Sequence, residues 1–230
     1  MTVTVDPYYQ DELVTIYHGD WRYAWAALDG ESTAVAVTDP PYGIGYESGM
    51  PSATIARSIV GDRDTTERDT FLNMWGDRPA LVFGSWRAPR HDGTRMLLVW
   101  DTKSALGMGD LTLPWKPAHQ EIYVLGRGFV GARTSDVLSY PPVQSTAANG
   151  RLHPHQKPVA LLEELICKCA ADATVVDPFM GVGSTLVAAR RLGRPAVGVE
   201  INERYCAIAA ERLGGPIRVE DGAFNFSEEV

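Results

Sequence analysis

The stretch "VVDPFMGVGSTLVAARRLGRPAVGVE", residues 175–200, decides the fold. An apolar run leads into Asp177, a loop carries Gly181 and Gly183, a helical pattern follows, and the next apolar run ends on Glu200. Glycines in such a loop serve a tight turn or the close approach of a ligand, and the helix N-terminus presents free N–H groups. An acid at the end of the second strand is placed to accept both hydroxyls of a ribose. The stretch therefore predicts a strand–helix–strand unit that binds a nucleoside-containing cofactor.

The loop of this unit favours a nucleoside without phosphates. It lacks the Gly-x-Gly-x-x-Gly spacing on which a pyrophosphate rests. It also lacks the Gly-Lys-Ser/Thr ending of a triphosphate-binding loop. The cofactor expected here is therefore a small nucleoside derivative.

Short β-rich runs alternate with helical patterns along the rest of the chain, which indicates an α/β protein with a mostly parallel sheet. The candidate strands are 15–18, 33–38, 80–84, 95–100, 120–126, 174–177 and 196–200.

Three helices are predicted near the C-terminal end of the sequence. The first starts with Pro158 in its first turn. The second has Ser184 as its cap and ends at Gly193, and the third starts at Asn202. The irregular segments 43–65 and 126–157 are candidates for functional loops.

Composition is that of an ordinary soluble globular protein. The 230 residues are 45% hydrophobic and 22% charged, which suits one domain with a sizeable core. The first residues show no leader pattern and no run is long enough to span a membrane, so a cytoplasmic protein is expected. Three cysteines, Cys167, Cys169 and Cys206, without a Cys-x-x-Cys pair predict reduced core residues and no metal site.

The net charge of −8 is unevenly distributed along the chain. Residues 78–157 carry ten Lys or Arg against five acids, whereas 1–31 and 220–230 carry ten acids and one base. Solvated surfaces explain such a pattern, but a local basic face that meets nucleic acid is also compatible with it.

A second motif, "VTDPPYGIGY" at 37–46, places an acid, two prolines and a tyrosine at the end of an apolar run. Together with "DPFMGVGST" it resembles the S-adenosylmethionine-dependent DNA amino methyltransferases, which methylate adenine N6 or cytosine N4. The resemblance extends over nearly the whole chain and includes "HGD" at 18–20, "VFGSW" at 82–86, "HQEIYVLGRG" at 119–128 and "HPHQKPVALLEELI" at 153–166.

The order of the motifs is similar to the β group of this family, because the "DPPY" motif precedes the cofactor loop. The resemblance implies a circularly permuted, Rossmann-like, three-layer methyltransferase fold. It implies one domain over 1–230, with a short target-recognition insert near 129–152.

The resemblance assigns catalysis to Asp39, Pro40, Pro41 and Tyr42. An exocyclic amino group is a poor nucleophile because its lone pair is delocalised into the ring. The Asp39 carboxylate and the Pro40 carbonyl would accept its two hydrogens and localise that lone pair, while two prolines stiffen the turn. Tyr42 would stack on the base, which must be flipped out of the duplex.

The cofactor contacts implied by the resemblance lie in three segments. Glu200 would hold the ribose, Phe179 would contact the sulfonium, and Lys157 would pair with the methionine carboxylate. Asp20 would lie near the cofactor adenine, with Asp221 as its rival. The full set is Asp20, Lys157, Asp177, Pro178, Phe179, Gly181, Gly183, Ser184 and Glu200. His155 stands where the family more often has Thr or Ser, and His153 is interpreted as a structural turn residue.

The resemblance implies a DNA methyltransferase that acts on a flipped base, and the "DPPY" form, which is more typical of adenine enzymes, favours adenine N6. Cytosine N4, an RNA base or a protein amide is the alternative substrate, and a catalytically silent subunit is the alternative class. Trp86, Arg87 and Arg90 are candidate DNA contacts. The short recognition insert suggests a homodimer or a partner subunit.

Overall fold

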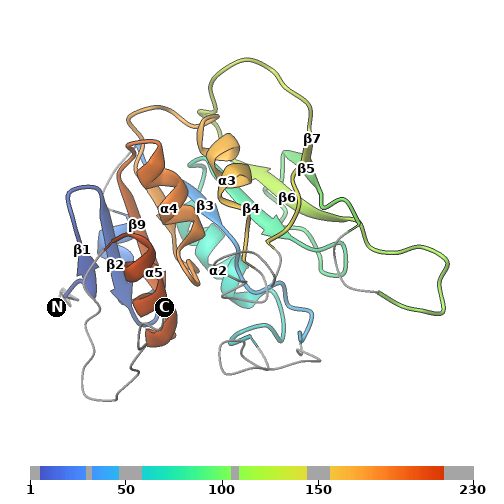
Figure 1. Ribbon diagram of the computed structural model, residues 1–230, viewed down its shortest axis with the longest axis horizontal. Helices are drawn as coiled ribbons and strands as arrows, with labels where there is room; N and C mark the ends of the chain where they lie inside the picture. The colour runs from blue at the N-terminus through green and yellow to red at the C-terminus, as the bar shows by residue number, and fades with distance from the viewer. Residues whose placement is uncertain (1–5, 30–32, 47–58, 105–108, 144–155, 215–230) are drawn as a thin grey trace, which may run out of the picture.

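The computed structural model describes residues 6–29, 33–46, 59–104, 109–143 and 156–214 (Figure 1). Its strands are β1 (Tyr9–Gln10), β2 (Val14–His18), β3 (Val35–Thr38), β4 (Ala80–Gly84), β5 (Met96–Asp101), β6 (His119–Leu125), β7 (Val137–Ser139), β8 (Val175–Asp177) and β9 (Ala196–Glu200). Its helices are α1 (Trp25–Leu28), α2 (Thr66–Trp75), α3 (Val159–Ile166), α4 (Ser184–Arg191) and α5 (Glu203–Arg212).

The strands form one mixed sheet in the order β1-β2-β9-β8-β3-β4-β6-β5-β7. The five strands from β2 to β4 run parallel, whereas β6 runs antiparallel to both β4 and β5. In the register of the parallel part, His18 pairs with Glu200 and Asp177 with Gly198, so the carboxyl ends of these strands meet at one edge. The predicted mostly parallel α/β sheet is confirmed.

Helices cover both faces of the sheet and complete three layers. One buried cluster joins α3, α4 and α5 to residues such as Val35 and Val37 of β3. The other joins α1 and α2 to Ala36 of the same strand, which points the opposite way as β-strand alternation requires. Figure 1 shows α3, α4 and α5 in front of the sheet and α2 behind it.

The chain changes direction across the sheet between β8 and β3, which are hydrogen-bonded neighbours. From β8 the chain passes through α4 to β9 on one side, and from β3 it passes through α2 to β4 on the other. Because α4 and α2 lie on opposite faces, a crevice opens at the carboxyl ends of β8 and β3. Ligands of open α/β sheets bind at such a switch point.

The seven predicted strands are all present, with bounds within two residues of those expected. The sequence patterns did not predict β1, β7, α1 or α2. Segment 126–157 was expected to be irregular, yet β7 within it pairs in parallel with β5.

Two helix starts differ from the sequence interpretation. Gly183, in a left-handed conformation with φ 74°, is the residue before α4, and Ser184 is the first helical residue instead of the cap. Pro158 precedes α3 with an extended ψ of 130° and is therefore outside its first turn. The third start is confirmed, because the Asn202 side chain accepts a hydrogen bond from the Arg204 N–H.

The cysteine prediction is wrong at one position. Cys169 and Cys206 are buried in the core as free thiols, but Cys167, the residue that follows α3, is exposed. Within the described ranges, no helix is both long and apolar enough to cross a membrane.

Candidate active site

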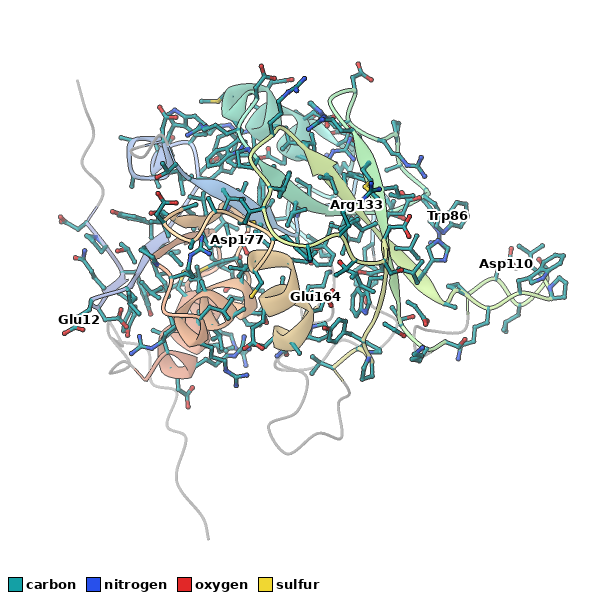
Figure 2. All side chains as sticks on the ribbon, turned by 90° about the horizontal axis from the view of Figure 1, so that it is seen from above. Glu12, Trp86, Asp110, Arg133, Glu164 and Asp177 are labelled. Carbon is teal, nitrogen blue, oxygen red and sulfur yellow. The ribbon has the colours of Figure 1, made fainter. Side chains whose placement is uncertain are left out.

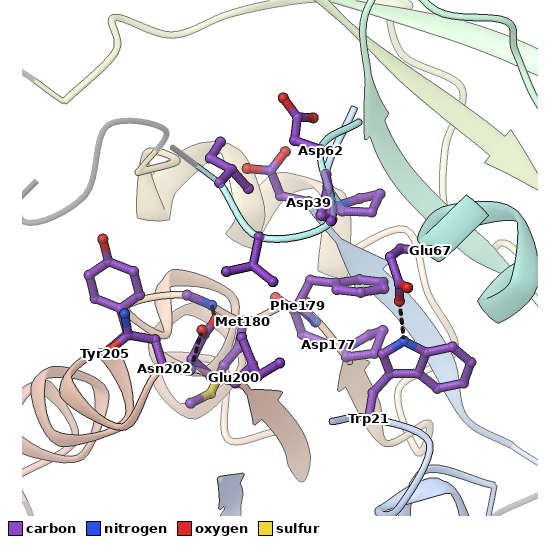
Figure 3. A pocket seen from close by; sticks show the side chains of 18 of the residues that line it. Trp21, Asp39, Asp62, Glu67, Asp177, Phe179, Met180, Glu200, Asn202 and Tyr205 are labelled. Carbon is purple, nitrogen blue, oxygen red and sulfur yellow. Dashed lines mark hydrogen bonds between the residues drawn. The ribbon is translucent and has the colours of Figure 1, made fainter. Parts of the chain in front are cut away.

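A cavity of about 390 Å³ opens at the carboxyl ends of the parallel strands (Figure 3). Residues that follow β2, β3, β8 and β9 line it, together with the segment that leads into α3. All catalytic and cofactor residues predicted from the sequence line this cavity except Gly183. His153, His155 and Asp221 lie outside the described residues.

Both oxygens of the Asp39 carboxylate, just after β3, accept hydrogen bonds. The Tyr42 hydroxyl donates to Oδ1 at 2.6 Å, and the Lys157 ammonium donates to Oδ2 at 2.5 Å. The Asp39 side chain is about one fifth exposed, at 22%, whereas Lys157 is buried at 5%. Asp39 is thus held from two directions while it still lines the cavity.

The Lys157 ammonium contacts the Asp39 carboxylate, and the sequence did not suggest this contact. Its ammonium also donates to the Tyr42 hydroxyl at 3.0 Å and lies 4.8 Å from the centre of the Phe83 ring. Burial lowers the pKa of Lys157, and the negative charge of Asp39 opposes that shift. The predicted contact of Lys157 with the cofactor carboxylate stays a prediction.

The same cluster affects the pKa of the Tyr42 hydroxyl. Burial, followed by the charge of Asp39, raises the pKa of Tyr42 well above its ordinary value, so its hydroxyl keeps its proton and acts as a donor. The prolines Pro40 and Pro41 separate Asp39 from Tyr42 and carry no N–H, so they offer only backbone acceptors to the cavity, the Pro40 carbonyl among them.

The loop after Tyr42 is fixed by Asp62, a buried acid that the sequence analysis did not single out. Its carboxylate accepts the backbone N–H of Gly43 at 2.8 Å and that of Tyr46 at 2.6 Å. Gly43 has φ 75°, and a Cβ there would meet the backbone carbonyl carbon of Asp64 at 2.5 Å. Segment 59–65 therefore packs against the loop after the "DPPY" turn and fixes its position.

Asp177, at the end of β8, joins the two motifs through a buried hydrogen bond. The hydroxyl of Thr38, the last residue of β3, donates to Asp177 Oδ1 at 2.7 Å, and the Phe179 N–H donates to the same oxygen at 3.2 Å. Burial raises the pKa of Asp177 to about 6. This carboxylate fixes the loop after β8 relative to β3.

Glu200, at the end of β9, accepts hydrogen bonds from two backbone N–H groups. The N–H of Gly181 donates to one oxygen at 3.0 Å and the N–H of Asn202 to the other at 2.8 Å (Figure 3). Burial raises the pKa of Glu200 to about 7. The glycine loop and the acid at the end of the next strand, which the sequence paired by spacing, are therefore in direct contact.

Comparison with known proteins decides the family. The sequence model described as DNA methylase, for N6 and N4 methyltransferases, matches residues 65–211. The chain belongs to the N6/N4 DNA methylase family. The Type II methyltransferase M.ScaI of Streptomyces caespitosus is 40% identical over 255 residues, covering 90% of this chain and 83% of the relative.

Other relatives and solved structures agree with this membership. The Type II methyltransferase M2.LlaDCHI of Lactococcus lactis subsp. cremoris is 26% identical over 247 residues, covering 90% of this chain and 91% of the relative. The M1.HpyAVI–SAM complex has the same fold, with a TM-score of 0.62 and 17% identity over 87% of this chain and 100% of that one. The cytosine-N4-specific PvuII DNA methyltransferase has a TM-score of 0.64 and 16% identity over 95% and 90%.

Methylases of this family use S-adenosylmethionine as the methyl donor, and the cavity residues of this methylase fit that cofactor. Gly181 has no heavy atom within 4 Å of the position that a Cβ would take, so the loop leaves room beside Glu200. Phe179 and Trp21 form an aromatic wall, with ring centres 6.4 Å apart. Aromatic faces attract the positive charge of a sulfonium.

Three predicted cofactor residues of the methylase are engaged with protein partners. Both oxygens of Asp20 accept bonds from the Arg22 guanidinium, at 3.1 and 3.0 Å, although Asp20 lines the cavity. Ser184 accepts a hydrogen bond from Arg212 at 3.2 Å. Gly183 lies where a Cβ would meet the Cβ of Ala209 at 2.7 Å, so its contact is with α5.

Several residues that line the methylase cavity were not found from the sequence. Trp21 and Glu67 are joined by a hydrogen bond of 3.2 Å from the indole N–H (Figure 3). Tyr205 and Phe83 also line the cavity, from α5 and β4. Trp21 directly follows the "HGD" motif, which was a usable signal, but Glu67 lies on a helix that the patterns did not reveal.

Proposed function

We propose that this protein transfers a methyl group from S-adenosylmethionine to the N6 amino group of an adenine flipped out of double-stranded DNA. One observation carries the proposal: Asp39, after β3, and Glu200, at the end of β9, line the same cavity on either side of β8. Asp39, as acceptor for an amino group, and Glu200, as acceptor for a ribose, thus lie at the same switch point of the sheet.

The cofactor supplies an electrophilic methyl group, and the residues of this chain hold it and the base. Glu200 accepts the ribose hydroxyls, while Phe179 presents its ring to the sulfonium. The loop from Asp177 to Gly181 surrounds the methionine part, with Pro178 stiffening its start. Asp20 lies at the adenine end of the cofactor, next to Trp21.

Asp39 and the Pro40 carbonyl accept the two amino hydrogens of the target base. This grip localises the nitrogen lone pair, which is otherwise shared with the ring, and points it along the direction of attack. The nitrogen gains a bond to the methyl carbon as the bond from that carbon to the sulfonium sulfur breaks and leaves its electron pair on sulfur, and the nitrogen must then lose one proton. The Asp39 carboxylate is already hydrogen-bonded to that nitrogen, so it is the group placed to accept the proton.

Tyr42 supplies a ring face on which the extruded base stacks. A stacked base contributes about 1–3 kcal/mol, which offsets part of the cost of unpairing it. The Tyr42 hydroxyl, bound to Asp39, fixes the ring relative to the acceptor. The stacked base and the Asp39 carboxylate are therefore held in a fixed position relative to each other.

DNA approaches along the sheet edge that carries the cavity. Trp86, Arg87 and Arg90 follow β4 at this edge, and Trp86 is 65% exposed with the Arg87 guanidinium 5.5 Å from its ring centre. Figure 2 shows Trp86 and Asp110, the latter on the segment between β5 and β6, at the outer side of the molecule. The short insert near 129–152 leaves few residues for reading sequence, so we infer that a second copy or a partner subunit contributes.

The choice of adenine rests on the "DPPY" motif. Cytosine N4 is the second candidate, because the structurally similar PvuII enzyme is cytosine-N4-specific. Both bases present a similar amino group, so the grip of Asp39 serves either. Mass spectrometry of nucleosides from DNA methylated by the protein decides between them. N6-methyladenine would support the proposal, and N4-methylcytosine would show that the target base is cytosine.

The wider function is tested by incubation with labelled S-adenosylmethionine and, separately, duplex DNA, RNA and protein. We expect label in DNA. Label confined to RNA or protein would refute the DNA substrate, and the absence of label in all three, with the cofactor bound, would indicate a silent subunit.

A further inference from the structure

We propose that Lys157 is a positioning residue for methyl transfer, because it holds the Asp39 carboxylate in the orientation that receives the target amino group. This inference rests on the proposed function of Asp39. It assigns Lys157 a role in the chemical step, in addition to the predicted contact with the cofactor.

The geometry around the carboxylate is the first support. The Lys157 ammonium donates to Asp39 Oδ2 at 2.5 Å while the Tyr42 hydroxyl donates to Oδ1 at 2.6 Å, and the ammonium also donates to that hydroxyl at 3.0 Å. The three groups form a closed triangle of hydrogen bonds. A carboxylate has about four lone-pair positions, so acceptor capacity remains for an amino group after these two bonds.

Lys157 is also placed rigidly. It precedes Pro158, and a residue before proline is restricted to extended conformations. Pro158 leads directly into α3, whose Leu161 and Leu162 are fully packed in the core. The lysine backbone is thus anchored to the sheet, and its side chain reaches the cavity over the faces of Phe83 and Tyr42.

The ion pair between Lys157 and Asp39 is largely shielded from water. The side chains of Lys157 and Asp39 are 5% and 22% exposed, so water competes poorly for the ammonium. Removal of the lysine would leave Asp39 with one donor and freedom to rotate. Asp39 and Asp177, at the end of β8, are the carboxylates whose negative charge acts on Lys157, and Asp62 and the neutral Tyr123 act on Tyr42 in the same cluster. Lys157 offsets the negative charge of Asp39 and Asp177.

The test compares Lys157→Met, which removes charge and donor, with Lys157→Gln, which retains a donor. Single-turnover methylation is measured at saturating S-adenosylmethionine and DNA, on whichever base the parent protein methylates. We expect the rate to fall at least 100-fold in Lys157→Met and less in Lys157→Gln. Lys168→Met, at a partly exposed lysine that donates to the Ala132 carbonyl, is the matched control and should keep the parent rate.

A comparison of rate with cofactor affinity provides the readout that a purely structural role would not change. At saturating cofactor and DNA the rate should fall by a larger factor than the affinity for S-adenosylmethionine, because the lost hydrogen bond is made to Asp39. Thermal melts and calorimetric binding of S-adenosylmethionine identify variants that remain folded.

Two results would overturn the inference. A folded Lys157→Met protein whose rate returns to the parent value once the cofactor is saturating would show that Lys157 serves cofactor binding alone. An equal loss of rate in Lys157→Gln and Lys157→Met would show that the hydrogen bond donated to Asp39 has no role. Failure of the proposed function is distinguished from both, because the parent protein would then transfer no methyl group to DNA.

Discussion

The Lys157 ammonium and the Asp39 carboxylate form an ion pair of 2.5 Å across 118 positions of sequence. This pair connects the "DPPY" turn after β3 to the segment that precedes α3. It therefore joins the part of the cavity proposed to receive the base with the chain segment that leads toward the cofactor half.

Glu200→Ala should weaken binding of S-adenosylmethionine and leave the fold intact. The variant loses a charged acceptor for the ribose hydroxyls, which costs on the order of 1.5–3 kcal/mol, or roughly 10- to 150-fold in Kd. Calorimetric titration measures the affinity, and circular dichroism checks the fold. Unchanged affinity in a folded variant would remove Glu200 from the cofactor site.

Cofactor affinity should rise with pH through about 7, because burial raises the pKa of Glu200 to about 7 and the ribose hydroxyls bind its ionised form. The same raised pKa affects the free protein. The contribution of Glu200 to the free energy of unfolding is full below its ordinary value of 4.5 and is lost as pH rises through 7. Glu200→Gln should flatten both profiles, and a pH dependence of cofactor affinity that survives in this variant would assign it to another group.

Tyr42→Phe should retain part of the activity, whereas Tyr42→Ala should lose most of it. The phenylalanine variant keeps the ring face and loses one hydroxyl bond, worth about 0.5–1.5 kcal/mol, so a decrease of up to roughly tenfold is expected. The alanine variant also loses stacking of about 1–3 kcal/mol. Single-turnover rates and DNA-binding titrations of both variants test this, and equal losses would show that the ring face has no role.

Gly183→Ala should lower stability more than Gly193→Ala. Both residues have positive φ, 74° and 66°, so both substitutions carry a similar backbone cost of about 1 kcal/mol. At Gly183 the added methyl group also overlaps the Cβ of Ala209, whereas at Gly193 no heavy atom lies within 4 Å. Urea denaturation measures the difference, and equal losses would mean that α4 and α5 do not pack tightly through Gly183.

The sheet was predictable because its strands are short, continuous apolar runs that end in acids or glycines. Buried parallel strands have this composition, and the runs at 80–84 and 196–200 match β4 and β9 in both bounds. The spacing from Gly181 to Glu200 also predicted one cofactor site, and a hydrogen bond joins the two residues, whereas their cofactor contacts stay a prediction. Local sequence was sufficient for these features.

The features that were missed depend on tertiary contacts. α2 mixes acids with buried Phe71 and Trp75, and its weak amphipathic pattern hides the packing against β4. β7 is a three-residue edge strand that forms through pairing with β5, for which its own sequence carries little signal. The contact of Lys157 with Asp39 likewise arises only when β3 and α3 are packed together.

The measurement that tests the account most directly is single-turnover methylation of duplex DNA by Asp39→Ala, with calorimetry of S-adenosylmethionine and a thermal melt run on the same preparation. The account predicts that the variant stays folded, binds the cofactor with nearly the parent affinity and loses almost all methyl transfer, because the lost bonds belong to the transition state. A folded Asp39→Ala protein that methylates DNA at close to the parent rate would contradict the gripping role of Asp39.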